Sequence, residues 1–259
     1  QAAQRLIASY ILDHHEGHSG IVYCLSRKDT HTMADALAQH SSGRIRTGVY
    51  HSDLDEAEKH RVHAQWRTGA IQVVCATIAF GMGIDKGDVR FVVHACISKS
   101  LEGYYQETGR AGRDGAPSDC VLLYRAAADM SRVSGMTASE VGAQAKLHAM
   151  LRYAQSELCR QSILATYFDE PRTEPCGVCD RCQSPPPRHA DVSVWAAHAV
   201  QVVSDVYARG SRITLAALAD AVYAAAKSDA ALSRVDCECL VVQLVLDGYL
   251  GERFQATAY

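Results

Sequence analysis

Two arginines stand three positions apart in the segment YYQETGRAGRDG, which spans residues 104–115. Arg110 and Arg113 lie among glycine and alanine, and the polar pair Gln106 and Glu107 precedes them. A guanidinium is permanently charged and matches two phosphate oxygens at once, and small neighbours let a ligand approach closely. Phosphoryl-transfer enzymes use such an arginine to stabilise the charge of the transition state. The segment is therefore a candidate site for an anionic ligand.

A solvated helix end is the alternative interpretation, with the two arginines paired to Glu107 and Asp114. For an isolated GRxGR pattern we would favour that alternative. The loop TIAFGMGIDKGD (residues 77–88) supplies a second segment suited to phosphate, because its glycines free backbone amides to face a ligand and Asp85 adds a carboxylate. A GxG loop alone is more often a plain turn, but the two segments together favour phosphate chemistry.

Four cysteines follow the spacing C-x16-C-x2-C-x2-C, at Cys159, Cys176, Cys179 and Cys182. Two overlapping Cys-x-x-Cys units can close on one metal ion, and a fourth thiolate completes a tetrahedral set. Zinc is the expected metal, in a structural role, because four sulfurs leave no open coordination position. A disulfide pair and an iron–sulfur cluster are the alternatives, and a reducing compartment disfavours the disulfide.

Short apolar segments alternate with helical patterns through the first half of the chain. The expected strands are residues 20–26, 44–51, 71–76, 89–95 and 120–124. The helix between the second and third strands is predicted to begin at Ser52 or Asp53 and to end at Gly69. This alternation predicts an α/β fold with a mostly parallel sheet and helices on both faces. Ligands gather at the carboxyl ends of such strands, where Ser26, His51 and Thr77 fall.

Length and composition set further limits. The chain has 259 residues, of which 48% are hydrophobic, so we expect two or three modules with real cores. A net charge of -3 gives no global basic field, so any nucleic-acid binding must depend on local groups. No apolar run approaches the length needed to cross a bilayer, and the first twenty residues carry acid and histidine where a signal peptide needs an apolar core. We therefore expect an intracellular protein without membrane contact.

Four segments carry a resemblance to a known family. They are SGIVYCLSRKDT, YHSDL, ATIAFGMGIDKGDVRFVVH and YYQETGRAGRDG, and they resemble the second motor domain of the RecQ DNA helicases, nearest the Bloom-type branch. The four-cysteine set resembles the zinc module that follows that motor, so the resemblance covers nearly the whole chain. It implies a RecA-like parallel sheet, then a helical four-cysteine zinc module, then a winged-helix domain. The corresponding ranges are residues 1–135, 136–186 and 187–259, with the stiff linker SPPPR near the second boundary.

The resemblance also implies roles for the phosphate-suited residues. Arg113 would be the arginine finger that reaches the ATP γ-phosphate, which the preceding motor domain holds together with Mg²⁺. Arg110 and Gln106 would support Arg113 across the cleft. Asp85 and Gly83 would lie near the nucleotide.

Another group of residues resembles those that contact the DNA phosphate backbone in the family: Ser26, Arg27, His51 and Thr77. One departure is visible here, because the family often has His-Ala-Gly where this chain has His51, Ser52 and Asp53. The added carboxylate would repel phosphate.

The last third of the chain predicts three helices, at residues 192–208, 215–226 and 233–247. The segments YLGERF and QATAY could pair as a short wing after them. The third helix would ordinarily read a DNA groove, but it carries Asp236, Glu238 and Asp247 against Arg234 alone. We expect weak phosphate binding by that face.

The sequence contains neither a GxxxxGK[ST] phosphate loop nor a DExH-type acidic motif, and both belong to the first motor domain in the family. We therefore expect a piece of a longer protein that alone neither hydrolyses ATP nor unwinds DNA.

The expected function is that of the C-terminal part of an ATP-dependent 3′-to-5′ DNA helicase in repair, recombination and replication. Its expected partners are single-stranded DNA, duplex junctions, the first motor domain of the same protein, and repair or recombination proteins. The nucleus is the expected location, or the cytoplasm if the source is bacterial. The alternative function is a scaffold without motor activity that binds DNA or proteins. An RNA helicase of a related superfamily is disfavoured by the cysteine module.

Overall fold

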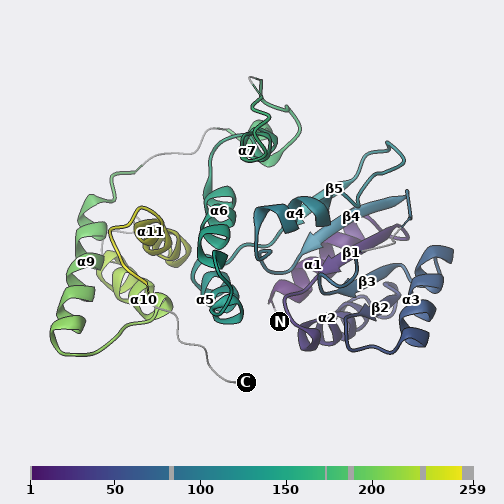
Figure 1. Cartoon of the computed structure of the whole chain (residues 1–259), viewed down its shortest axis with the longest axis horizontal. Helices are drawn as coiled ribbons and strands as arrows, with labels where there is room; N and C mark the ends of the chain where they lie inside the picture. The colour runs from purple at the N-terminus through teal and green to yellow at the C-terminus, as the bar shows by residue number, and fades with distance from the viewer. Residues whose placement is uncertain (1, 82–84, 173, 186–189, 228–231, 253–259) are drawn as a thin grey trace. The chain divides into compact units, whose positions relative to one another are not determined.

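The structure is a computed structural model that describes residues 2–81, 85–172, 174–185, 190–227 and 232–252. The chain divides into two compact units, which are described separately (Figure 1). The first consists of Gln1–Ser98 and Glu102–Tyr124, and the second of Lys99–Leu101 and Arg125–Tyr259. The division into modules at residues 135 and 186 stays a prediction. Among the described residues, no helix combines the length and the apolar character that a membrane crossing needs.

A five-stranded parallel sheet forms the centre of the first unit, in the order β2-β3-β1-β4-β5. The strands are β1 (Ser19–Tyr23), β2 (Thr47–Tyr50), β3 (Val73–Ala76), β4 (Val89–His94) and β5 (Asp119–Leu122). All five expected strands are present, and the expected parallel pairing is confirmed. Strands β1, β3 and β4 lie in the middle of the sheet and are covered on both faces, which explains their nearly continuous apolar runs.

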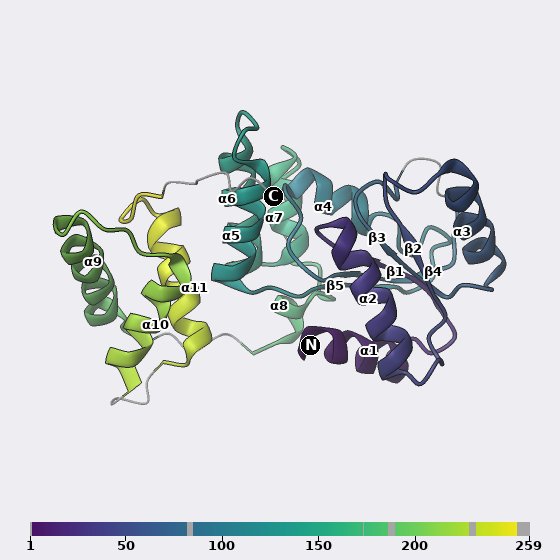
Figure 2. The ribbon, with the colours of Figure 1, turned by 90° about the horizontal axis from the view of Figure 1, so that it is seen from below.

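Helices α1 (Ala2–His14) and α2 (Arg27–His40) cover one face of the sheet, as Figure 2 shows. Ile11 and Leu37 from these helices are fully buried against Val22 and Phe91 of the sheet. Helix α1 was not among the expected elements. Its buried pair Ile7 and Ile11, spaced by one helical turn, is the signal that would have revealed it.

Helix α3 (Glu56–Thr68) covers the opposite face. Trp66 of this helix is fully buried and lies edge-on to Phe80, with the ring centroids 5.3 Å apart. Side chains of β1, β3 and β4 that alternate with those of the first face complete this core, among them Ile21, Val74 and Val92.

The predicted start of helix α3 is wrong, but its predicted end is confirmed. The helix is capped by Asp55, whose carboxylate accepts a hydrogen bond from the backbone amide of Glu58 at 2.7 Å. Neither Ser52 nor Asp53 serves as the cap, since Asp53 is ion-paired with Arg27. Gly69 ends the helix with φ 80°, the left-handed geometry that favours glycine.

The second unit is helical in the residues that the structure describes. Its helices are α5 (Ala126–Thr137), α6 (Ala143–Gln155), α7 (Arg160–Tyr167), α8 (Asp180–Gln183), α9 (Ser193–Ala208), α10 (Leu215–Ala226) and α11 (Arg234–Leu246). Helices α5 and α6 pack together, and α10 and α11 pack on each other and on α5. His148 of α6 lies 2.6 Å from the Glu252 carboxylate beyond α11, which ties these helices together.

The three helices expected in the last third of the chain are confirmed as α9, α10 and α11. Ser233 caps α11 in a reciprocal capping box with Asp236. The expected wing falls mainly on residues 253–259, which lie outside the described residues, so the winged-helix assignment stays a prediction.

Candidate nucleotide, DNA and metal sites

The arginine segment folds against the loop that follows β3. Helix α4 (Leu101–Thr108) ends just before Gly109, and the Arg110 guanidinium donates a hydrogen bond from Nη1 to the Gly81 carbonyl at 2.6 Å. A Cβ atom at position 81 would lie 2.8 Å from Nη2 of Arg110, so a larger residue there would displace the end of the arginine side chain. The two phosphate-suited segments of the sequence are therefore brought together in one unit.

A backbone hydrogen bond and an ion pair hold the rest of the arginine segment. The Gly112 amide donates to the Val89 carbonyl at 2.9 Å, and Gly112 has φ 62°. Arg90 donates two hydrogen bonds to the Asp114 carboxylate, at 2.6 and 2.7 Å, and its guanidinium lowers the pKa of that carboxyl. These contacts hold the loop after α4 against the start of β4.

The helix-end interpretation pairs the two arginines with Glu107 and Asp114. In the structure, other side chains bind both carboxylates. Asp114 is engaged by Arg90, and Glu107 accepts hydrogen bonds from Ser98 at 2.5 Å and from His94 at 2.7 Å. Arg113 is exposed, and its Nε donates to the Gly109 carbonyl at 3.2 Å. The structure thus leaves the Arg113 side chain at the surface of the unit.

Three other residues were expected near the nucleotide, and the structure describes two of them. Gln106 and Asp85 are both exposed, on α4 and in the loop before β4 respectively. Gly83 lies outside the described residues. Sequence reasoning therefore placed the arginines and Asp85 in adjoining loops, and it missed Arg90, which anchors the arginine segment.

The residues expected to contact DNA follow the carboxyl ends of three neighbouring strands. Ser26 and Arg27 follow β1, His51 follows β2 and Thr77 follows β3. The sheet order β2-β3-β1 brings these ends to one edge. Ser26 caps α2: its hydroxyl accepts from the Asp29 amide at 3.2 Å and donates to the Asp29 carboxylate at 2.7 Å.

Two features of this edge were not expected. Asp53, the departure from the family pattern, forms an ion pair with Arg27 and so neutralises part of its charge. His51 is buried, and its Nε2 lies 2.9 Å from Nε2 of His31. The pKa of His51 is lowered, first by burial and then by the neighbouring cationic groups of His31, Arg27 and Lys59. His31 could have been suspected only from its position on the expected helix after the first strand.

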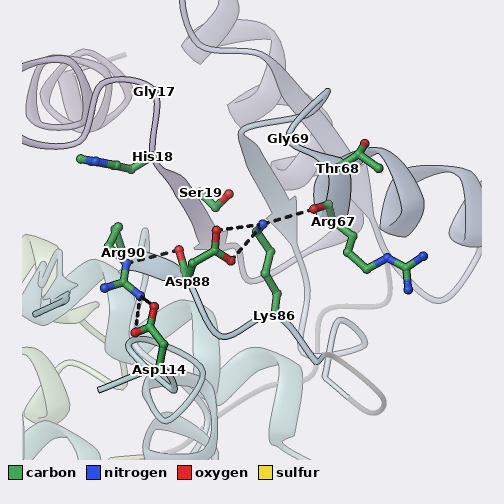
Figure 3. Close-up of a pocket in the computed structure, with 10 residues that line it drawn as sticks. All are labelled: Gly17, His18, Ser19, Arg67, Thr68, Gly69, Lys86, Asp88, Arg90 and Asp114. Atoms are coloured by element: carbon green, nitrogen blue, oxygen red, sulfur yellow. Dashed lines mark hydrogen bonds and ion pairs between the residues drawn. The ribbon is translucent and has the colours of Figure 1, made fainter. Parts of the chain in front are cut away.

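A pocket of 440 Å³ lies at the amino ends of β1 and β4, where Ser19 and Asp88 border it (Figure 3). Lys86 pairs with Asp88 at 3.0 Å, and Arg90 is held by Asp114. The charges of Lys86 and Arg90 are therefore matched by carboxylates. The pocket also lies at the opposite end of the strands from the residues expected to contact DNA.

The four cysteines Cys159, Cys176, Cys179 and Cys182 form one cluster, with their sulfur atoms all within 4.8 Å of one another. Measured Sγ···Sγ separations are 3.5, 3.9 and 4.0 Å. A tetrahedral zinc with bonds of about 2.3 Å places its sulfurs about 3.8 Å apart. A disulfide needs about 2.05 Å, and all ten cysteines of the chain are free thiols in the described residues. The set fits a structural zinc ion.

Hydrogen bonds and burial change the pKa values of the cysteine thiols in opposite directions. Burial raises the pKa of the Cys159 thiol, but hydrogen bonds from the Cys176 amide and from Ser162 outweigh it and lower that pKa to about 5. The pKa of Cys182 is raised to about 12, because burial and the neighbouring sulfurs outweigh the hydrogen bond from the Gly177 backbone. Holding all four cysteines as thiolates would therefore require a divalent cation.

Arg160 braces the cluster and was missed from the sequence. Its guanidinium donates to both Asp180 oxygens at 3.0 Å and also to the Tyr153 carbonyl. The guanidinium carbon lies 5.3 Å from the centroid of the Tyr153 ring. The Arg160 amide additionally donates to Cys179 Sγ at 3.5 Å. Arg160 thereby joins the cysteine loop to the end of α6.

Two segments of the chain match families of known proteins. Residues 2–115 match the family model described as the helicase conserved C-terminal domain, and residues 127–183 match the one described as RecQ zinc-binding. The ATP-dependent DNA helicase Q-like 2 of Arabidopsis thaliana is 41% identical over 257 residues, covering 98% of this chain and 36% of the relative. The ATP-dependent DNA helicase Q1 of Rattus norvegicus is 37% identical, covering 98% and 42%. The RecQ-like DNA helicase BLM of Xenopus laevis is 36% identical, covering 96% and 21%.

The parallel sheet and the docked arginine segment fall in or at the end of the range that matches the helicase C-terminal domain, and the four-cysteine cluster falls in the range that matches the RecQ zinc-binding model. Residues 2–115 are thus similar to the helicase conserved C-terminal domain, and residues 127–183 to the zinc-binding domain of RecQ proteins. It spans between 21% and 42% of the length of the three relatives named above.

Proposed function

We propose that this chain is the C-terminal part of the motor of an ATP-dependent 3′-to-5′ DNA helicase. The observation that carries the proposal is the docking of Arg110 on Gly81, which joins the arginine segment to the glycine loop and leaves Arg113 exposed. An exposed arginine on a fixed loop suits a site completed by another domain. ATP and Mg²⁺ would be held by that other domain of the same protein.

Each nucleotide-facing residue has a proposed task. Arg113 reaches the γ-phosphate and stabilises the charge that develops on it, and Gln106 supports it from the same side. Arg110 holds the segment on the glycine loop. Asp85 and Gly83 are the proposed contacts of the nucleotide itself, as the resemblance implies. Closure of the two domains on ATP and reopening after hydrolysis would then drive movement along the strand.

The carboxyl-end edge is the proposed track for the DNA backbone. Ser26, Arg27, His51 and Thr77 are its proposed contacts, and their place just after three adjacent strands supports this. The ion pair of Arg27 with Asp53 must open, or share its charge, for Arg27 to bind phosphate. We therefore expect Asp53 to weaken DNA binding at this edge.

The zinc module stabilises the helical unit and takes no part in hydrolysis, because its four sulfurs leave no open position on the metal.

We also propose the three-module division at residues 135 and 186, the winged helix, repair or recombination proteins as partners, and a nuclear location, or a cytoplasmic one in a bacterium. Assignment to the Bloom-type branch stays a prediction, since the helicase Q1 relatives match this chain at similar identity.

ATP hydrolysis by the longer protein that contains this chain tests the proposal. Arg113→Ala should lower the DNA-stimulated turnover by about a thousandfold, the scale of arginine-finger effects. Arg61→Ala is the matched control, because Arg61 is an exposed arginine of α3 that pairs with Glu58. Equal turnover in the Arg113→Ala variant and the wild type would remove the finger assignment.

A further inference from the structure

A buried polar network lies under the arginine segment, between β4 and α4. His94 is 1% exposed and Glu107 is 6% exposed. One carboxylate oxygen of Glu107 is 2.7 Å from His94 Nε2 and accepts the Ser98 hydroxyl at 2.5 Å. Buried polar groups of this kind are costly unless they are paired, and these three side chains satisfy one another.

The tautomer of His94 follows from its surroundings. Its Nδ1 is buried and has no hydrogen-bond partner among the described residues. A proton on that nitrogen would have no acceptor there, so the imidazole carries its proton on Nε2 and donates it to Glu107. Tyr23 stacks on the ring at 5.2 Å with an interplanar angle of 23°, and Tyr104 of α4 packs at 4.8 Å. The histidine ring is therefore held by two aromatic side chains.

Both ends of Arg110 are connected to this network. The Arg110 backbone amide donates to the Glu107 carbonyl at 3.4 Å, one turn earlier. The guanidinium donates to the carbonyl of Gly81, and the preceding residue, Phe80, accepts the Tyr23 hydroxyl at 2.8 Å. Tyr23 in turn stacks on His94. The network therefore joins β4 to the end of α4 and, through Tyr23, holds the residue that precedes the carbonyl on which Arg110 rests.

We propose that Glu107 and His94 are positioning residues for the arginine segment: their buried hydrogen bond sets where Arg110, and the loop that carries Arg113, stand when nucleotide is bound. This rests on the proposed function. The bond does not touch the reacting atoms, so it acts only through the arginines. A misplacement of about 1 Å in such a group can cost about a hundredfold in rate.

Kinetics of the longer protein separate positioning from simple stabilisation. Glu107→Ala should lower kcat for DNA-stimulated ATP hydrolysis by about tenfold to a hundredfold. Glu107→Gln keeps an oxygen acceptor for both donors and should retain most of the turnover. In the double variant, Glu107→Ala should add little to Arg110→Ala, because residues that act through one another are not additive. If Glu107→Ala does not fold, Ser98→Ala, which removes one donor, should give a smaller loss with the same lack of additivity.

A second readout does not depend on activity. Amide hydrogen exchange at Arg110 should be faster in the Glu107→Ala chain than in the wild type. Gln72→Ala is the matched control, because Gln72 is 2% exposed and donates to the His15 carbonyl at 3.2 Å, away from the arginines. It should lower stability while leaving kcat and the Arg110 exchange rate unchanged.

Three results would overturn the proposal: wild-type kcat in Glu107→Ala, full additivity with Arg110→Ala, or unchanged exchange at Arg110. Loss of the proposed function is distinguishable from these. If the wild-type longer protein shows no DNA-stimulated hydrolysis, the helicase assignment fails, and the exchange measurement alone decides whether Glu107 positions the segment.

Discussion

Replacing Arg160 with alanine should loosen the zinc module without removing a metal ligand. The guanidinium connects the cysteine loop, through Asp180, to the Tyr153 carbonyl and ring on α6. The backbone amide that donates to Cys179 Sγ is unaffected by the substitution. Arg160→Ala therefore tests the brace alone.

The size of the effect follows from the exposure of each contact. Asp180 is 58% exposed, so its ion pair with Arg160 is screened by solvent and contributes at most about 1 kcal/mol. The hydrogen bond to the Tyr153 carbonyl is charge-assisted, and the stacking over the ring adds a smaller amount, so the total loss is about 2 kcal/mol. If the brace is present only in the metal-bound fold, zinc affinity falls by about 30-fold. This lies within the tenfold to hundredfold range typical of partners that orient metal ligands.

Competition with a coloured chelator measures this change directly, as the chelator concentration at which half of the zinc is removed. Arg172→Ala is the control, because Arg172 is an exposed arginine of the same module that donates to Gln161. It should behave as the wild type. If Arg160→Ala releases zinc no more readily than Arg172→Ala, the brace does not support the site and the reasoning from these contacts is refuted.

Three other predictions concern the metal, the core and the pH response. The purified chain should hold about one equivalent of zinc, and Cys182→Ser should lose most of it; iron and visible colour instead would reverse the assignment. Gly20→Ala should destabilise the first unit by about 3 kcal/mol in urea unfolding, because its Cβ would lie 2.1 Å from the Phe91 ring; Gly135→Ala, with nothing within 4 Å, should cause no loss, and equal effects would contradict the packing argument. The pKa of His51 in the folded chain is depressed below its usual value of 6.5. As the pH falls below 6.5, the unfolded chain therefore binds a proton that the folded chain does not, and the stability that neutral His51 contributes is lost. His51→Gln should flatten the fall in unfolding free energy between pH 7 and 5, and an unchanged slope would exclude His51 as its source.

The sheet could be predicted from the sequence because parallel strands buried on both faces leave continuous apolar runs. The start of α3 could not, since Ser52, Asp53 and Asp55 are all suitable caps and the choice depends on a distant partner. Arg27 comes from another helix and engages Asp53, which leaves Asp55 to cap. Only the folded chain brings Arg27 to that loop.

The candidate sites show the same limit. The cysteine ligands were predictable because two overlapping Cys-x-x-Cys units form a recognisable pattern, whereas no sequence pattern marks the pairing of Arg160 with Asp180, 20 positions away. Glu107 looked like a partner for the neighbouring arginines, but β4 supplies His94 and turns that carboxylate inward. Ligands that follow a known spacing can be recognised in a sequence, whereas contacts between distant residues can be seen only in the folded chain.

The most direct test of the helicase assignment is strand separation by the longer protein that contains this chain. The substrate is a partial duplex with either a 3′ or a 5′ single-stranded tail, incubated with ATP and Mg²⁺. We expect unwinding of the 3′-tailed duplex that requires ATP and is abolished by Arg113→Ala, with little unwinding of the 5′-tailed duplex. Absence of ATP-dependent unwinding of either substrate, under conditions where the protein is folded and binds DNA, would contradict the assignment.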